Sequence, residues 1–278
     1  MTDWKTIVVI VDADDVDVVS GIAWELGVGG IEEHVRPDTQ VELRIGCEAE
    51  RAQLVLDALS SKWSPIAESV AADEGLDAWR EYAQSWRVGN MVIVPPWLET
   101  PLELVDNDQV FFIDPGHAFG SASHETTRMC LAVLAELVVP GCSVADIGCG
   151  SGVLAIVAAH LGASRVIATD IAAEAIVSSL ENVRRNEVED IVEVSTATVE
   201  EFAHASFDLV VANIGAATLC AMANELVRIT KLGGVLVLSG ILDEQVDTVR
   251  SAFEQAGTEC SETRAEGEWR TLVMTRPR

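Results

Sequence analysis

The pattern of hydrophobic and polar residues changes at about residue 110 of the chain. Before that point, short strand-like runs such as "WKTIVVIVD" at 4–12 are separated by two segments with apolar residues at helical spacing. The resulting order, β-α-β-β-α-β, is the ferredoxin-like α+β arrangement. After that point, apolar strands alternate with helices, which is typical of a largely parallel sheet covered on both faces.

The elements that we expect can be given by range. In the first region they are strands at 4–12, 30–35, 40–46 and 65–71 and helices at 14–27 and 48–62. In the second region they are strands at 110–114, 143–148, 165–171, 191–194, 207–214, 233–241 and 270–276, mostly with helices between them. We therefore predict a small domain at 1–70, a linker at 71–105 and a large α/β domain at 106–278.

The predicted linker is rich in large aromatic residues, with Trp79, Tyr82, Trp86 and Trp97 close together. We expect a helix here whose tryptophans pack it onto the following domain, because large aromatic side chains are first of all packing material. An aromatic wall beside a substrate is the alternative. The first 70 residues hold no obvious cluster of catalytic side chains, so that domain is better suited to holding a partner than to chemistry.

Acidic residues dominate the charge of this 278-residue chain: 45 Asp and Glu stand against 18 Lys and Arg, for a net charge of −27. Such a surface repels a phosphate backbone, which argues against direct binding of DNA or RNA. It attracts a basic partner, although solubility in high salt would favour the same composition. The charge alone does not decide between these two explanations.

The cysteines and the apolar runs indicate the compartment. The six cysteines are scattered and form no C-x-x-C pair, so we expect reduced thiols and no metal site. No apolar run approaches the ~18 residues that span a bilayer. The N-terminus also lacks the basic flank and cleavage site of a secretory signal. We therefore expect a cytoplasmic protein without membrane contact, and we expect it to be a monomer.

The segment "VADIGCGSGVLAIVAAHLGASRVIATDI" at 144–171 has the outline of a nucleotide-binding strand–helix–strand unit. Gly148, Gly150 and Gly152 follow its first strand with the spacing G-x-G-x-G. The dinucleotide motif reads G-x-G-x-x-G, and Val153 stands where its third glycine belongs. The glycine spacing therefore speaks against a dehydrogenase.

The acid before this turn favours a different ligand. Asp146, two residues before the first glycine, would stand at the mouth of a phosphate cradle and repel a pyrophosphate. S-adenosylmethionine has no phosphate and carries a sulfonium and an ammonium group, so an acid suits it. Gly148 and Gly150 let the backbone approach its amino-acid end, and Asp170 can accept both ribose hydroxyls. We therefore predict S-adenosylmethionine rather than a dinucleotide.

A loop upstream of the glycine turn could fold over the bound cofactor. This segment, "DPGHAFGSASHETT" at 114–127, is rich in glycine and serine and precedes a predicted helix. The alternative is an ordinary loop that ends in a helix cap, for which Ser123 and Thr126 are suitable residues. His124 is a conceivable proton acceptor, but we favour it as a helix-capping residue.

The segment "VVANIGAATL" ends a predicted strand at Asn213. Open α/β sheets bind ligands at the carboxyl ends of their strands, and Gly148 and Asp170 occupy two further ends of this kind. The Asn213 side-chain oxygen and the Ile214 carbonyl could accept the N–H groups of an amine and aim its lone pair at a methyl group. We therefore predict Asn213 as the catalytic residue, acting mostly by positioning the acceptor.

Together these segments resemble the bacterial ribosomal protein L11 methyltransferases of the PrmA type over nearly the whole chain. The order "ELGVGGIEE", "WRVGNMVIVPPW", "DPGHAFGSASHETT", "ADIGCGSGVLAI", "ATDI", "VVANI" and "EWRTLVMTR" is similar to that family's order. The resemblance implies a ferredoxin-like substrate-recognition domain and a Rossmann-like, seven-stranded class I methyltransferase domain. It also implies methyl transfer to lysine side chains and to the N-terminal amine of that basic protein of the large ribosomal subunit.

By motif, the resemblance implies cofactor contacts at Thr127, Gly148, Asp170 and Asn213. The family usually reads G-T-G-T-H-P-T-T where this chain has "GSASHETT", and N-I-L-A where it has "NIGA". Gly215 removes a side chain beside the expected acceptor, which leaves open a related methyltransferase for another protein or a small amine. A cofactor-binding module without turnover is a further alternative, but Asn213 argues against it.

Overall fold

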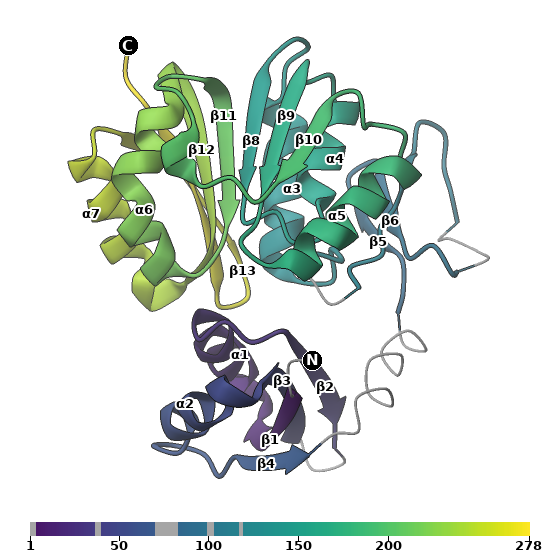
Figure 1. The fold of residues 1–278 in the computed structure, drawn as a ribbon, viewed down its shortest axis with the longest axis vertical. Coiled ribbons are helices and arrows are strands. Elements are labelled where there is room, and N and C mark those ends of the chain that lie inside the picture. The colour runs from purple at the N-terminus through teal and green to yellow at the C-terminus, as the bar shows by residue number, and fades with distance from the viewer. Residues whose placement is uncertain (1–3, 37–39, 70–82, 99–102, 117–118) are drawn as a thin grey trace. The chain divides into compact units, whose positions relative to one another are not determined.

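The computed structural model describes residues 4–36, 40–69, 83–98, 103–116 and 119–278 (Figure 1). These residues belong to two compact units, Met1–Ala83 and Gln84–Arg278, and each is described by itself below.

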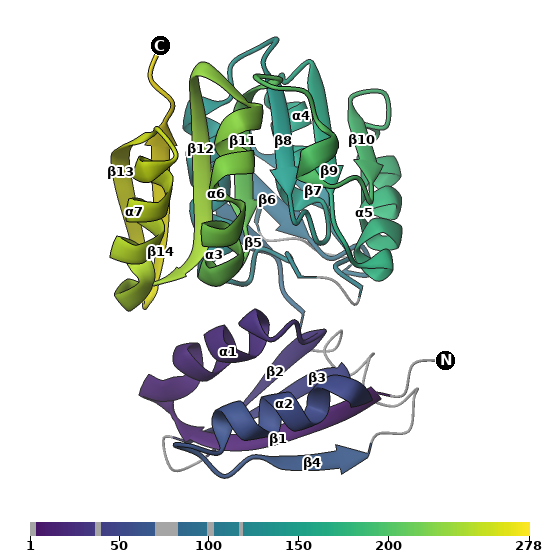
Figure 2. The same cartoon turned by 60° about the vertical axis from the view of Figure 1, so that its left-hand side comes forward.

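The smaller unit is a four-stranded antiparallel sheet with two helices on one face (Figure 2). The strand order β2-β3-β1-β4 confirms the ferredoxin-like prediction. In β3 every second residue is buried, from Val41 to Cys47, because one face of the sheet packs against the helices. The elements are β1 (Trp4–Asp12), η1 (Ala13–Asp15), α1 (Val16–Glu25), β2 (Gly30–Val35), β3 (Gln40–Glu48), α2 (Ala49–Leu59) and β4 (Ile66–Ser69).

The larger unit is built on a seven-stranded sheet in the order β10-β9-β8-β11-β12-β14-β13. The first five of these strands are parallel to one another, and β14 is antiparallel to both of its neighbours. This Rossmann-like sheet confirms the predicted fold class. Its strands are β8 (Ser143–Ile147), β9 (Arg165–Thr169), β10 (Val192–Ser195), β11 (Phe207–Asn213), β12 (Thr230–Leu242), β13 (Glu259–Glu266) and β14 (Trp269–Thr275).

Helices cover both faces of this sheet, as Figure 1 shows. One face carries α3 (Glu125–Leu137), α4 (Val153–His160) and α5 (Ala173–Arg185); the other carries α6 (Ala216–Ile229) and α7 (Val246–Gln255). The short helices η3 (Val199–Glu201) and η4 (Asp243–Gln245) lie in connections. Each face has its own apolar core, and the central strand β8 sends Val144 into one core and Ala145 into the other.

A separate three-stranded sheet precedes the seven-stranded one in the chain. It consists of β5 (Trp86–Val88), β6 (Met91–Val94) and β7 (Gln109–Phe112). The strand predicted at 110–114 is therefore real, but its assignment to the main sheet is wrong. Its place there is taken by the edge strand β13, which the sequence analysis did not include. None of the β13 side chains is buried and most of them are polar, so this strand has no apolar alternation to reveal it.

Much of the predicted linker at 71–105 lies outside the described residues, including the expected helix, Trp79 and Tyr82. Trp86 is part of β5, and its ring lies 4.9 Å from the Arg128 guanidinium carbon. The larger unit begins at Gln84, and the division at residues 70 and 105 stays a prediction. Among the described residues, no helix combines the length and the apolar character needed to cross a bilayer.

Candidate functional site

Three predicted site residues stand at one edge of the main sheet. Gly148 follows β8, Asp170 follows β9 and Asn213 ends β11. These strands are parallel neighbours in the order β9-β8-β11, so their carboxyl ends meet at the same edge. The prediction that the three positions converge is confirmed. This edge is where open α/β sheets bind ligands.

The turn after β8 has a backbone that only glycine adopts readily. Gly148, Gly150 and Gly152 have φ angles of 73°, 53° and 80°, all in the left-handed region. A Cβ at Gly148 would come within 2.4 Å of the Ile214 side chain, and one at Gly150 within 2.3 Å of the Phe119 carbonyl oxygen. The glycines are therefore required for the close packing of the turn against Ile214 and Phe119, and they also leave its backbone at the strand ends without side chains.

Asp170 links this turn to the start of α5. One carboxylate oxygen accepts the Gly150 N–H at 3.0 Å, and the other accepts the Ala172 N–H at 2.9 Å. Each oxygen keeps a lone pair, because a carboxylate accepts about four hydrogen bonds. The carboxylate is thus held in a fixed orientation while it can still receive two hydroxyl groups of a ligand.

Asp146 lies elsewhere than expected. We placed it at the mouth of the turn, but its side chain is completely buried, with 0% exposure. One oxygen accepts the Ala155 N–H in the first turn of α4 at 3.1 Å, because the N-cap residue Gly152 has no side chain to do so. The other oxygen has no hydrogen-bond partner among the described residues. Any effect on a ligand must therefore act from beneath the turn.

Burial raises the pKa of Asp146 from its ordinary 3.8 to about 7, the Ala155 N–H opposes this rise, and Asp170 adds to it. The folded chain therefore keeps a proton that the unfolded chain loses above about pH 4. We expect the burial of Asp146 to lower the free energy of unfolding increasingly as pH rises from about 4 to 7, and to a constant extent above that.

Asp146→Asn should remove this pH dependence. The free energy of unfolding of the variant minus that of the wild type should therefore increase from pH 5 to pH 8. Urea titrations of both proteins without cofactor measure the difference, and the many other carboxyl groups cancel in it. A constant difference between pH 5 and 8 would contradict the raised pKa.

The loop before α3 lies against the glycine turn. The Ser151 N–H donates to the Phe119 carbonyl at 2.8 Å, and the Ser151 hydroxyl donates to the Gly120 carbonyl at 2.6 Å. Residues 117 and 118 of this loop lie outside the described residues. In the first turn of α3 the buried Thr127 accepts a hydrogen bond from the Asn213 amide at 3.4 Å. The structure thus brings Thr127 and Asn213 together.

His124 caps α3, rather than Ser123 or Thr126. Its Nδ1 accepts the Thr126 N–H at 3.3 Å and lies 2.8 Å from the Thr126 hydroxyl. Burial lowers the pKa of His124 to about 4, although the Glu125 carboxylate opposes this shift. The ring is therefore neutral at pH 7, with Nδ1 engaged as an acceptor, which agrees with the preference for a capping role.

Two residues at this edge escaped the sequence analysis. Ile171, directly after Asp170, is 95% exposed and offers an apolar surface beside the carboxylate. Trp269 is 3% exposed, its ring centroid lies 4.9 Å from that of His124, and its buried N–H has no partner among the described residues. An apolar residue at a strand end is a usable signal for Ile171. No local signal reveals Trp269, because it reaches the edge only through the antiparallel course of β14.

Two residues of "GSASHETT", Ala122 and Glu125, replace the glycine and the proline of the usual family pattern, and each lies in a different structural setting. Ala122 has a φ of 63°, a left-handed conformation that costs a residue with a Cβ about 1 kcal/mol and suits the glycine of the family pattern. Glu125 is the first residue of α3, where proline is also favoured. Its carboxylate instead forms an ion pair with Arg128 at 2.9 Å. Neither change removes a contact described above between the loop and the turn.

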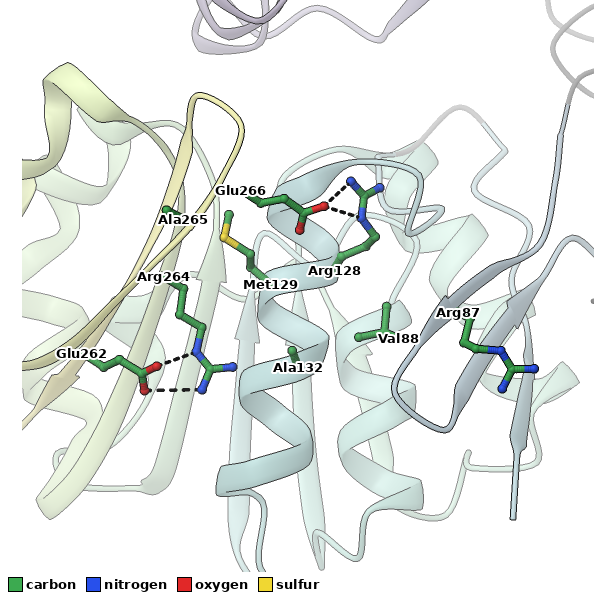
Figure 3. A pocket seen from close by; sticks show the side chains of 9 residues that line it. All are labelled: Arg87, Val88, Arg128, Met129, Ala132, Glu262, Arg264, Ala265 and Glu266. Atoms are coloured by element: carbon green, nitrogen blue, oxygen red, sulfur yellow. Dashed lines mark hydrogen bonds and ion pairs between the residues drawn. The ribbon is translucent and has the colours of Figure 1, made fainter. Parts of the chain in front are cut away.

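A pocket of about 560 Å³ lies between β5, α3 and β13, and none of the predicted site residues lines it. In Figure 3, Arg128 points to Glu266 and Arg264 to Glu262, at 2.7 and 2.9 Å. The third arginine of the lining, Arg87, pairs with Asp108. Because the arginines are already paired with carboxylates, the pocket has no free charge for a ligand, and we keep the strand ends as the candidate site.

Comparison with known proteins shows the family. The family model described as "Ribosomal protein L11 methyltransferase (PrmA)" matches residues 38–277. The chain belongs to this family. A ribosomal protein L11 methyltransferase of Chloroflexus aurantiacus is 35% identical over 99% of both chains. One of Geotalea daltonii is 40% identical over 76% of this chain and 70% of its own.

Among solved structures, the ribosomal protein L11 methylase of Lactobacillus delbrueckii subsp. bulgaricus matches with a TM-score of 0.64. It is 30% identical, and the match covers 70% of this chain and 100% of that one. The chain is therefore an L11-methyltransferase-family enzyme, and its cofactor is S-adenosylmethionine.

The strand ends of this methyltransferase fit that cofactor. The turn brings backbone without side chains to the strand ends, and Asp170 offers two oriented acceptors. The buried Asp146, whose pKa lies near 7 without a ligand, would ionise more readily beside a bound cation and less readily beside a phosphate. The bound cofactor supplies an electrophilic methyl group on a sulfonium.

Proposed function

We propose that this enzyme methylates ribosomal protein L11 on lysine side chains and on the N-terminal amine. The observation that carries the proposal is the full-length similarity to proteins named for this substrate, with 99% of both chains covered in the first case above. The similarity extends over the smaller unit as well as the methyltransferase unit. The smaller unit, to which we assign substrate binding below, is thus shared with these relatives, and this supports a shared substrate.

For the cofactor site we propose six residues. Gly148 and Gly150 let the backbone lie against the amino-acid end, and Asp170 accepts the ribose hydroxyls. Asp146 acts from beneath the turn, because its side chain is buried, and a bound cation favours its ionised form. Thr127 and Asn213, which are hydrogen-bonded to each other, face the methyl end. All six come from the carboxyl edge of the sheet or from the helix next to it.

For the acceptor we propose that Asn213 holds the amine in line with the methyl group. When its NH₂ group donates to Thr127, its side-chain oxygen is left to accept an N–H of the substrate. The Ile214 carbonyl provides the second acceptor. A free lysine has a pKa of about 10.4, and desolvation beside a cation lowers it, so that the attacking amine is neutral. No dedicated base is required, in agreement with the low pKa of His124.

The substrate and the charge of the enzyme suit each other. A net charge of −27 attracts a basic ribosomal protein and repels nucleic acid, so we propose that the enzyme binds the free protein substrate directly. We propose further that it acts in the cytoplasm as a monomer and that the smaller unit binds the substrate. That unit has its own core and is free of the proposed cofactor residues.

Isotope-labelled S-adenosylmethionine, incubated with the enzyme and total protein of the large ribosomal subunit, tests the substrate. We expect the label in L11 alone, at lysines and at the N-terminus when peptides are examined by mass spectrometry. Label in a different protein would show that the substrate is another one, as Gly215 leaves open. No transfer to any protein or small amine would indicate a module without turnover.

A variant that lacks residues 1–83 separates substrate recognition from chemistry. The larger unit keeps both of its apolar cores, so we expect cofactor binding within about threefold of the full-length enzyme. Labelling of L11 should fall at least about 100-fold, the size of a lost binding free energy of about 3 kcal/mol. Efficient labelling of L11 by the shortened enzyme would contradict the role of the smaller unit.

A further inference from the structure

Two asparagines in α5, Asn182 and Asn186, bind the end of β7 as a neighbouring strand would. Asn182 accepts the Asp114 N–H at 2.9 Å and donates to the Asp114 carbonyl at 2.7 Å. Asn186 accepts the Phe112 N–H at 2.9 Å and donates to the Phe112 carbonyl at 2.8 Å. Because residues four apart lie on the same side of a helix, the two amides meet alternate residues of the segment. Both side chains are buried.

Of these two amides, Asn182 also reaches the glycine turn. Its NH₂ group donates to the Ser151 carbonyl at 2.9 Å. Ser151 in turn donates from its N–H to Phe119 and from its hydroxyl to Gly120. The second NH₂ bond of Asn186 goes instead to the backbone carbonyl of Asn182, within the helix. Asn182 therefore connects three parts: helix α5, the glycine turn and the segment that begins the loop.

The same helix holds the turn at a second point. The Ser179 hydroxyl donates to the Gly150 carbonyl at 2.7 Å, and the Gly150 N–H donates to Asp170 at 3.0 Å. Ser179 and Asn182 are three residues apart and both fully buried. The carbonyls of consecutive turn residues are thus fixed from beneath, while the N–H of Gly150 orients the carboxylate that we assign to the ribose. A shift of the Ser151 carbonyl would therefore reach Asp170 through Gly150, the neighbouring residue, whose N–H binds the carboxylate.

We propose that Asn182 is a positioning residue that preforms the S-adenosylmethionine site by fixing the glycine turn against the segment at 114. It does not touch the cofactor. The inference rests on the assignment of the glycine turn to cofactor binding. Loss of the amide removes the hydrogen bonds that Asn182 donates to the Ser151 and Asp114 carbonyls, so the turn samples other conformations, and the population competent to bind falls.

Calorimetry of S-adenosylmethionine binding to the full-length enzyme tests this, with Asn186→Ala as the matched control. Both variants lose hydrogen bonds to the same segment, so both should lower the melting temperature of the cofactor-free enzyme by similar amounts. We expect Asn182→Ala to raise Kd about 10-fold or more and Asn186→Ala less than about threefold. If Asn182→Ala does not fold, Asn182→Asp serves, because it keeps the acceptor beside Arg185 and loses both donations.

Steady-state kinetics add a result that a merely structural role would not produce. Asn182→Ala should raise KM for S-adenosylmethionine about 10-fold and leave kcat at saturating cofactor within about threefold, since the reacting atoms are untouched. Equal Kd values for the two asparagine variants would overturn the proposal. If the wild-type enzyme itself did not bind S-adenosylmethionine, the failure would lie in the proposed cofactor site instead.

Discussion

Replacement of Asp170 by alanine is expected to weaken S-adenosylmethionine binding about 100-fold, a loss of about 2.7 kcal/mol. The wild-type carboxylate is held by the N–H groups of Gly150 and Ala172, and the ribose hydroxyls would add two charge-assisted hydrogen bonds. Hydrogen bonds to a charged group contribute about 1.5–3 kcal/mol each, net of compensation by water, so the loss of one such bond is already enough for an effect of this size. Isothermal calorimetry on the purified variant measures the change in Kd.

Two controls separate this role from a general effect on charge or folding. Glu174→Ala removes an exposed acid from the first turn of α5, the helix that follows Asp170, and should leave Kd unchanged. A cofactor analogue without ribose hydroxyls should bind the wild type weakly but lose little further affinity in Asp170→Ala, because the shared interaction is already absent. Near-native affinity of Asp170→Ala for the complete cofactor, or additive losses with the analogue, would refute the ribose assignment.

The strand ends of the main sheet could be predicted from the sequence because each has a strong local signal. An apolar strand before Gly148, another before Asp170 and a third ending at Asn213 are enough to place all three at one edge of a parallel sheet. The glycine spacing likewise predicts a turn with left-handed φ angles. These features depend on neighbouring residues in the chain and on one rule of topology.

The burial of the Asp146 side chain could not be predicted in the same way. In the sequence it stands two residues before the first glycine, and nothing in that position tells whether its side chain faces the ligand or the core. In the structure it caps α4, because Gly152 stands at the N-cap and has no side chain. The burial of Asp146 is thus tied to how α4 starts, and it rules out the expected position at the mouth of the turn.

Contacts between distant segments explain the remaining differences. Trp269 meets His124, and Asn182 meets Asp114, across 145 and 68 positions of the chain respectively. Their sequence surroundings are those of an ordinary strand and an ordinary amphipathic helix. Such positions become visible only when the sheet order and the helix packing are known. Of these positions, Asn182 also holds the glycine turn, through the Ser151 carbonyl.

Replacement of Asn213 by alanine is expected to lower kcat about 100-fold or more while Kd for S-adenosylmethionine stays within about threefold. A single preorganised polar group at a reacting centre is worth about 10²–10³ in kcat, and here its contribution is the alignment of the amine with the methyl group. The side chain lies at the end of β11 and contacts Thr127, so its removal leaves the glycine turn and Asp170 intact. Single-turnover labelling of L11 and calorimetry measure the two quantities.

The hydrogen bond to Thr127 provides the matched comparison for Asn213. Thr127→Val removes the hydroxyl that orients the Asn213 amide and should lower kcat about 10-fold, whereas Thr127→Ser keeps it and should stay near the wild type. Asn213→Asp offers acceptor oxygens but adds a negative charge that raises the pKa of the bound amine, so its kcat should recover as pH rises. Equal losses of kcat and of cofactor affinity in Asn213→Ala would make Asn213 a cofactor residue only and leave the acceptor to be positioned by the Ile214 carbonyl.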